Sequence, residues 1–142
     1  MNYPLQRQPY NPFNLIWIIL AILIFLLTGV INRVRAEEIY LTASWYSLQS
    51  LKDEGTYKLT KGRCADGSMF KDEGYSCAVY GYKFGTILKV TNIKTSASVQ
   101  VVVKDRIGKR FKGRRIDLSK FAFQKICDLD KGLCKVKVEV LR

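Results

Sequence analysis

The chain has no histidine among its 142 residues, and this absence excludes several kinds of active site. A Ser-His-Asp triad, a Cys-His pair, a zinc site with histidine ligands and a histidine proton shuttle all require an imidazole. Any acid–base chemistry must therefore use the 12 carboxylates or a Lys, Tyr or Cys side chain. The hydrophobic content of 48% and charged content of 25% are typical of a globular protein, and the length predicts one domain with an appendage.

The appendage is a long apolar segment near the start of the chain. Every residue from Leu15 to Leu27 is apolar, and the run continues to Ile31, which makes 17 residues. A membrane span needs about 20 apolar residues and a signal peptide about 7–15, so the length lies between the two. Small residues at Val34-Arg35-Ala36 match a signal-peptidase site. We therefore expect residues 1–36 to be either a cleaved signal peptide or a single-span anchor that inserts residues 15–31 into the membrane.

Charges and cysteines give opposite indications of the compartment. Arg33 and Arg35 directly follow the apolar run, and positive-inside counting would place the rest of the chain in the cytoplasm. The four cysteines all follow that run, and an even number favours disulfides and export. We expect the two local pairs, Cys64–Cys77 and Cys127–Cys134. Without a C-x-x-C pair an all-cysteine zinc site is disfavoured, so we expect no metal and no cofactor. The prediction is an exported protein, periplasmic or extracellular.

The exported part is strongly basic. Residues 1–36 contain three arginines and no acids, so residues 37–142 carry 21 basic and 12 acidic side chains, a net charge of +9. A basic exported domain meets anionic wall polymers, peptidoglycan carboxylates or lipid head groups in place of nucleic acid. We therefore predict a monomer whose partner is peptidoglycan or another anionic wall polysaccharide, and no nucleic-acid partner.

Period-two hydrophobic patterns predict a mainly β domain. Alternating or β-branched segments indicate strands over residues 39–46, 86–91, 98–103 and 134–140. One helix is expected after an N-cap at Ser119, with Ala122, Phe123 and Ile126 on its apolar face and its end near Cys127. Residues 55–82 are rich in Gly, Asp and Lys, and we expect an irregular loop there. These elements together predict a small closed barrel.

Three stretches, in this order and spacing, resemble a known family. They are Ala43-Ser44-Trp45-Tyr46, then Phe84 to Asn92 continuing to Lys104-Asp105-Arg106, and last Arg115-Ile116-Asp117-Leu118-Ser119. On these stretches residues 40–141 look like the double-psi β-barrel of the RlpA-like (rare lipoprotein A) proteins, which are relatives of expansins and barwin. The resemblance implies that residues 37–142 form a six-stranded barrel with one or two short helices and a groove. It also implies an exported bacterial protein that binds or acts on peptidoglycan.

The resemblance assigns a candidate catalytic residue. Active members resemble lytic transglycosylases, which cleave the β-1,4 bond after N-acetylmuramic acid and leave a 1,6-anhydro end. Because the C6 hydroxyl of the sugar attacks, one carboxylic acid can serve first as acid and then as base, unlike the carboxylate pair of ordinary glycosidases. Asp105 matches the family's catalytic aspartate, and it is the candidate acid/base here.

Departures from the family pattern surround Asp105. Ser68 replaces a family glutamate, and the family's histidine falls at about Val79. Asp72 and Glu73 are carboxylates that could take the place of the lost one. Cations close in sequence are expected to lower the pKa of Asp105, which favours binding over proton donation. We therefore expect a peptidoglycan-binding barrel with weak or no catalysis; the alternatives are a lytic transglycosylase and an expansin-like polysaccharide-binding module.

The remaining candidate residues are basic or aromatic. Residues 104–120 hold eight cations and two acids. They form either a solvated loop or a basic strip that binds anionic polymer, and the candidate binding residues in that strip are Arg106, Lys109, Arg110 and Lys112. Tyr80 and Tyr82 are candidates for stacking on sugar rings, although aromatic residues in strands more often belong to the core. Asp117 and Ser119 are expected to be structural, because a carboxylate and a cap just before a helix complement its dipole.

Overall fold

The computed structural model describes residues 16–24 and 38–141, and the chain divides into two units at residues 35 and 36. In the first unit, residues 16–24 form a helix with exposed side chains. Among the described residues, no helix has the length and apolar character needed to cross a membrane. The rest of the expected signal or anchor segment, and the expected cleavage site at Ala36, lie outside the described residues.

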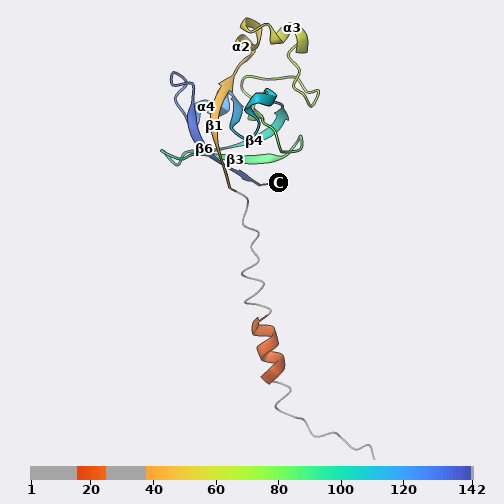
Figure 1. Ribbon diagram of the computed structural model, residues 1–142, viewed down its shortest axis with the longest axis vertical. Helices are drawn as coiled ribbons and strands as arrows, with labels where there is room; N and C mark the ends of the chain where they lie inside the picture. The colour runs from red at the N-terminus through yellow and green to blue at the C-terminus, as the bar shows by residue number, and fades with distance from the viewer. Residues whose placement is uncertain (1–15, 25–37, 142) are drawn as a thin grey trace, which may run out of the picture. The chain divides into compact units, whose positions relative to one another are not determined.

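In the second unit six strands close into a barrel, as the sequence predicted (Figure 1). Their order around the barrel is β1-β5-β2-β4-β3-β6, with β1 parallel to β5 and β2 parallel to β4. The strands are β1 (Ile39–Tyr46), β2 (Ser76–Ala78), β3 (Ile87–Asn92), β4 (Ser98–Asp105), β5 (Arg115–Ser119) and β6 (Cys134–Val140). The short strand β2 lies inside the segment that was expected to be irregular.

The barrel interior is filled by the alternate residues of each strand. Val90 of β3, Val103 of β4 and Val138 of β6 are fully buried. The residues on either side of each of them in the same strand are less buried or face outward. Phe123, which follows β5 on a short helix, adds the largest fully buried side chain. This alternation arises because successive side chains of a strand point to opposite faces.

Residues 38–141 contain more helix than the one or two segments expected. The helices are α2 (Leu48–Asp53), α3 (Thr56–Thr60), the 3-10 helix η1 (Lys109–Phe111) and α4 (Lys120–Gln124). Figure 1 shows α2 and α3 beyond the end of β1. Ser47 and Ser50 form a capping box at the start of α2. That cap lacks the Glu or Gln that signals a helix start in a sequence. Helix α4 ends at Gln124, earlier than the expected end near Cys127.

The structure confirms one expected disulfide and contradicts the other. Cys127 and Cys134 are bonded, whereas Cys64 and Cys77 are free and buried. The β2 backbone directs Cys77 into the core, where it is fully buried. Cys64 is held in a separate turn, where its N–H donates to Ser68 O at 2.8 Å and its carbonyl accepts from Gly67 N–H at 2.9 Å. The predicted Cys64–Cys77 bridge is therefore wrong: Cys77 packs in the core of the barrel, while its turn holds Cys64 outside that core cluster.

Candidate functional site

Four residues on neighbouring strands form a row that brings two carboxyl groups together. In the strand register Ser44 of β1 pairs with Asp117 of β5, Asp117 pairs with Ala78 of β2, and Ala78 pairs with Asp105 of β4. Adjacent strands lie about 4.8 Å apart, so the Cα atoms of Asp105 and Asp117 are separated by about 10 Å. We call Ser44, Asp117, Ala78 and Asp105 the acid row. Ala78 stands between the two acids in this register.

Asp105 ends β4, where a loop holds its carboxylate. Its Oδ1 accepts hydrogen bonds from Arg106 N–H at 2.7 Å and Ala65 N–H at 3.1 Å. Burial raises the pKa of Asp105; these two amides oppose the rise, and the negative charge of Asp66 adds to it. The expectation of a lowered pKa is therefore wrong, because desolvation outweighs the cations that lie close in sequence.

The Arg106 side chain is held by backbone carbonyl groups, and its positive charge also opposes the rise in the pKa of Asp105. Its guanidinium donates to Val79 O at 3.0 Å and Tyr82 O at 2.9 Å, and it lies 3.8 Å from the centre of the Phe84 ring. These contacts tie residues 79–84 to the end of β4, and the expected role of Arg106 in substrate binding stays a prediction.

Asp117, expected from the sequence to be structural, is the second carboxyl group of the row. Its carboxylate accepts a hydrogen bond from the Ser44 hydroxyl. Burial raises the pKa of Asp117 against that hydrogen bond and the positive charge of Arg115, while the negative charges of Glu54 and Asp105 add to the rise. Ser119 is the N-cap of α4 and accepts from Ala122 N–H at 3.4 Å. Only the register of β1 and β5 identifies Ser44 as the partner of Asp117, and no local sequence signal carries that register.

The loop positions that depart from the family pattern have their own partners. Ser68 donates to the Asp66 carboxylate through N–H at 2.8 Å and through Oγ at 2.6 Å. Asp66 is slightly desolvated, but these hydrogen bonds and Lys104 lower its pKa. The Asp72 carboxylate accepts from Leu48 N–H at 2.8 Å and so takes part in the start of α2. Asp72 therefore binds the first turn of α2 and does not belong to the acid row, whose second carboxyl group is Asp117.

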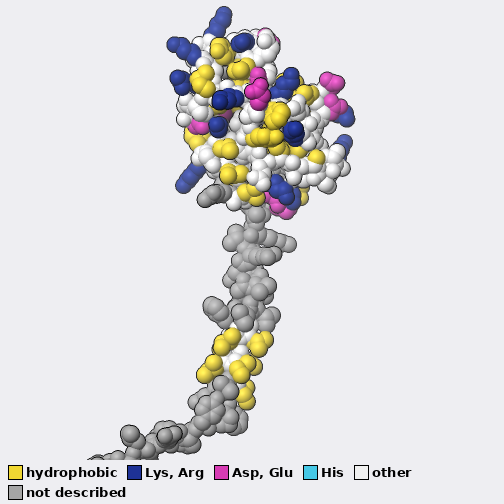
Figure 2. Space-filling view, turned by 180° about the vertical axis from the view of Figure 1, so that it is seen from behind, with side chains coloured by type: hydrophobic (Ala, Val, Ile, Leu, Met, Phe, Trp, Pro, Cys, Tyr) yellow, Lys and Arg dark blue, Asp and Glu magenta, His cyan; other side chains and the backbone are white. Residues whose placement is uncertain are grey.

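Aromatic and basic candidates lie in different surroundings. Tyr82 packs against the core, whereas Tyr80 is partly exposed, so Tyr80 is the better placed of the two to meet a sugar ring. Lys109, Arg110 and Lys112 are exposed on and just after η1, and their role in binding stays a prediction. Figure 2 shows Lys and Arg side chains spread over one face of the domain, with hydrophobic side chains between them.

Tyr46 and Cys64 complete the surroundings of Asp105. The Tyr46 ring stacks on Phe70 at a centroid distance of 4.5 Å. Burial, followed by the nearby Asp105 charge, raises the pKa of Tyr46 and raises that of Cys64 to about 11, so both stay neutral near pH 7. In residues 16–24 and 38–141 no group of three His, Cys, Asp or Glu side chains could hold a metal. The available chemistry is hydrogen bonding by hydroxyls and carboxyls, and proton storage on two acids whose pKa values are raised.

Comparison with known proteins places the chain beside cell-wall enzymes. A probable endolytic peptidoglycan transglycosylase RlpA from Nostoc sp. is 38% identical over 77 residues, which is 54% of this chain and 20% of that protein. A protein of the same description from Aquifex aeolicus is 34% identical over 100 residues, which is 70% of this chain and 40% of that protein. The matches thus span less than half the length of each curated relative. No family model matches the chain.

Solved structures share the barrel. A mutant Clavibacter michiganensis expansin in complex with cellohexaose has a TM-score of 0.53 and 25% identity, over 74% of this chain and 50% of that one. A Streptomyces papain inhibitor, at 18% identity, shares the fold with a TM-score of 0.57 over 77% of this chain and 99% of that one. These likenesses, the RlpA relatives and the closed six-stranded barrel identify residues 38–141 as an RlpA-like double-psi β-barrel domain, related to that of expansins.

Proposed function

We propose that the barrel binds the glycan strands of peptidoglycan at the acid row, in cell-wall or septal remodelling, with weak or no catalysis. The observation that carries this proposal is the row itself, in which the partly exposed residues Ser44, Asp117 and Asp105 place one hydroxyl and two carboxyl groups on neighbouring strands. Such groups match the hydroxyls of a sugar chain, which both donate and accept hydrogen bonds. The curated relatives are named as peptidoglycan transglycosylases, which supports peptidoglycan as the polymer.

Weak or absent catalysis follows from the residues around Asp105. The position of the family's glutamate is Ser68, whose hydroxyl is bonded to Asp66. The position of the family's histidine is about Val79, which is 2% exposed. No second acid or base therefore comes from these two positions.

The first alternative is a lytic transglycosylase with Asp105 as acid/base, and the raised pKa of Asp105 favours it. A protonated Asp105 would give its proton to the leaving glycosidic oxygen as the C1–O bond breaks. It would then take the proton of the C6 hydroxyl as that oxygen bonds to C1, which returns Asp105 to its starting state without water. The second alternative is an expansin-like polysaccharide-binding module, supported by the expansin structure with cellohexaose.

Mass spectrometry of digested glycan strands separates binding from catalysis. The full chain is incubated with purified peptidoglycan strands, and 1,6-anhydro ends are counted alongside co-sedimentation. The proposal expects co-sedimentation without new ends, and a loss of binding in Asp105→Asn and Asp117→Asn. Asp130→Asn, an exposed acid outside the row, is the matched control. New ends that disappear in Asp105→Asn would establish the transglycosylase instead, and binding to cellulose as strong as to peptidoglycan would favour the expansin-like module.

Export is the compartment that this function requires. The Cys127–Cys134 disulfide supports an oxidising location, periplasmic or extracellular. A cleaved signal peptide or a membrane anchor over residues 15–31 would each deliver the barrel there. Comparing the mass of the mature protein with that of the full chain tells the two apart.

A further inference from the structure

One exposed aromatic side chain, Phe84, belongs to the loop that borders Asp105. We call residues 79–85 the Phe84 loop. Phe84 is 42% exposed, and among the described residues of the barrel only Tyr40 and Tyr75 are aromatic residues of greater exposure. Tyr40 lies near the start of β1, four positions before the acid row, and the Tyr75 ring already packs edge-on against another aromatic ring at 5.2 Å. Phe84 therefore differs from both, because it is an exposed ring beside a candidate acid.

The Phe84 loop is fixed to the end of β4 by hydrogen bonds at both of its ends. Val79 N–H donates to Asp105 O at 3.2 Å, and Gly85 N–H donates to Val103 O at 2.9 Å. Gly85 has a φ of +82°, a left-handed conformation that glycine adopts without strain, and it turns the chain back towards the barrel. The backbone therefore holds the loop at a set place beside the acid row, to which Asp105 belongs.

The Arg106 guanidinium orients the Phe84 ring. Its central carbon lies 3.8 Å from the ring centre, and its nitrogens donate to Val79 O at 3.0 Å and to Tyr82 O at 2.9 Å. A guanidinium stacks on an aromatic face because that face is electronegative. The guanidinium covers one face of the ring, and the exposure of Phe84 leaves the opposite face to solvent. A ring held in this way loses little conformational entropy when a ligand binds to it.

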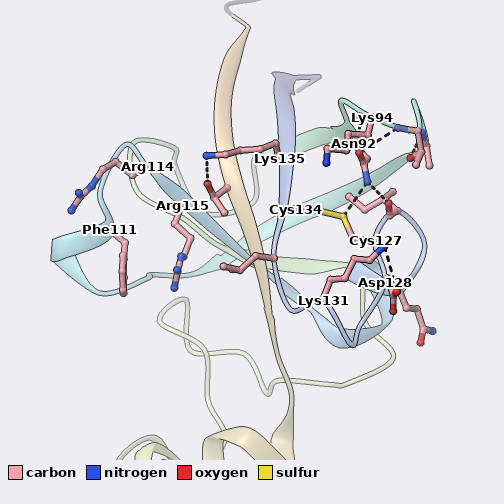
Figure 3. Close-up of a pocket in the computed structure, with 16 residues that line it drawn as sticks. Asn92, Lys94, Phe111, Arg114, Arg115, Cys127, Asp128, Lys131, Cys134 and Lys135 are labelled. Atoms are coloured by element: carbon pink, nitrogen blue, oxygen red, sulfur yellow. Dashed lines mark hydrogen bonds and ion pairs between the residues drawn. A yellow bond between two sulfur atoms is a disulfide. The ribbon is translucent and has the colours of Figure 1, made fainter.

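The aromatic residue of the large pocket elsewhere on the barrel is more covered. This pocket has a volume of about 1150 Å3, and neither the acid row nor the Phe84 loop lines it. Figure 3 shows its aromatic residue, Phe111, on the same side of the β1 ribbon as Arg115. Phe111 is only partly exposed, and two guanidinium groups contact its ring, that of Arg110 at 4.7 Å and that of Arg115 at 4.3 Å. A ligand therefore has better access to the Phe84 ring than to the Phe111 ring.

We infer that Phe84 is a stacking platform for a sugar ring of the glycan strand at the acid row. A β-1,4-linked pyranose of gluco configuration carries its polar substituents around the rim, so its two faces consist of C–H groups. These groups carry a partial positive charge and match the apolar, electronegative face of an aromatic ring. The hydroxyl and carboxyl groups of the row bind the rim, whereas Phe84 contacts the face.

The platform gives the site a preference for one class of sugar. A galacto-configured ring projects a hydroxyl from one face, which places a polar group against the ring of Phe84. The strand that the site accepts is therefore β-linked and gluco-configured. This inference rests on the proposed binding of glycan strands and adds the residue that reads the face of the sugar.

Binding of purified glycan strands to the full chain, measured by co-sedimentation in a non-ionic detergent, tests the platform. Phe84→Leu keeps an apolar side chain over Arg106 but removes the ring face, and Phe84→Trp enlarges that face. Tyr40→Leu, which removes a ring that is 64% exposed and lies outside the site, is the matched control. The urea midpoint of each variant shows whether it is folded.

We expect Phe84→Leu to weaken binding about fivefold, as the loss of one aromatic contact predicts, and Phe84→Trp to bind at least as well as the wild type. Tyr40→Leu should bind like the wild type. Equal binding by Phe84→Leu and the wild type, or an equal loss in Tyr40→Leu, would overturn this inference and leave the proposed function standing. A wild type that does not bind the strands would overturn the proposed function.

A second measurement keeps the inference testable if Phe84→Leu does not fold. Proton NMR follows an oligomer of β-1,4-linked N-acetylglucosamine as the wild type is added, and a galacto-configured oligomer is the comparison. A ring that stacks on a sugar face shifts the signals of the axial C–H protons upfield through its ring current. We expect these shifts for the N-acetylglucosamine oligomer alone. Shifts that are absent, that are equal for the two oligomers, or that persist in a folded Phe84→Leu would overturn the inference.

Discussion

The proton affinity of Asp105 is set by its surroundings in space and hardly by its neighbours in sequence. Seven Lys and Arg residues lie within ten positions of Asp105, yet burial raises its pKa. Arg106, which directly follows Asp105, donates hydrogen bonds to the carbonyl oxygens of Val79 and Tyr82. The folded state therefore holds a proton on Asp105 more tightly than the unfolded state does.

This difference predicts how stability changes with pH. Because the folded pKa lies above the ordinary value of 3.8, protonated Asp105 favours the folded state, and the contribution is lost as pH rises through the folded pKa. We expect the free energy of unfolding of the wild type, minus that of Asp105→Asn, to fall as the pH rises from the ordinary value of 3.8 through the folded pKa. Urea unfolding of both proteins at a series of pH values measures this difference in free energy. A difference that rises with pH would contradict a raised pKa of Asp105.

Asp66 provides a control of opposite sign. Its lowered pKa means that ionised Asp66 favours the folded state, a contribution present above 3.8 and lost as the pH falls. The free energy of unfolding of the wild type, minus that of Asp66→Asn, should therefore rise as the pH increases towards about 4 and stay level above it. Parallel trends for the two variants would mean that titration at neither site governs the effect.

Arg106 is predicted to stabilise the fold through its two carbonyl partners. Arg106→Ala should lower the free energy of unfolding by about 2 kcal/mol, since it leaves Val79 O and Tyr82 O without this donor and uncovers Phe84. Arg106→Lys should recover little of this, because an ammonium lacks the planar fork that reaches both oxygens. The urea midpoint measures the change, and Lys109→Ala, at an exposed position, should stay within about 0.5 kcal/mol of the wild type.

At the scale of elements, the turn that holds Cys64 and the strand that holds Cys77 keep two thiols unreactive. Cys64 is 4% exposed and Cys77 is fully buried, and burial raises their pKa values to about 11 and about 12. A thiol that is both inaccessible and protonated reacts slowly with disulfide reagents.

Titration with Ellman's reagent in the absence of reductant tests this arrangement. The native chain should show almost no fast-reacting thiol near pH 8, and the chain in guanidinium should show two, because Cys127 and Cys134 stay bonded. Cys64→Ser should reduce the count in guanidinium to one. A count of zero for the unfolded wild type would mean that Cys64 and Cys77 are bonded after all.

Elements with strong periodicity were predictable, and short ones were not. The predicted ranges 39–46 and 134–140 match β1 and β6, because seven or eight residues suffice to recognise the hydrophobic pattern of a strand. Strand β2 has three buried residues and no exposed one between them, so it carries no alternation. Helices α2 and α3 have six and five residues and bury none of them, so neither carries an apolar stripe.

At the scale of the whole molecule, the barrel could be predicted from the sequence, whereas the neighbours of Asp105 in space could not. The acid row depends on the pairing of Ala78 with Asp105 and Asp117, which lie 27 and 39 positions further along the chain. A pocket elsewhere on the barrel likewise brings together Lys94, Arg114 and Lys135 from three different loops or strands. Register between distant strands is set by packing of the whole barrel, which no single stretch of sequence encodes.

The net charge of residues 37–142 predicts a salt dependence of binding. Residues 37–142 carry a charge of +9, so binding to insoluble peptidoglycan should weaken steeply when salt is raised from about 50 mM to about 500 mM, as the Debye length shortens. Lys109→Gln with Lys112→Gln should make this dependence shallower. If salt does not change the binding of either the wild type or the double variant, hydrogen bonding and not charge attraction holds the complex.

Closure of the barrel limits the ways in which any partner can be recognised. Each of the six strands has a hydrogen-bonded neighbour on both sides, so residues 38–141 present no open sheet edge to which an extended chain could add as a further strand. This domain therefore cannot recognise a partner by adding its backbone as a further strand, a mode of binding in which side chains contribute little affinity. Specificity must then reside in side chains on the outer face and in the loops, so two barrels of the same topology can read different polymers after a handful of substitutions.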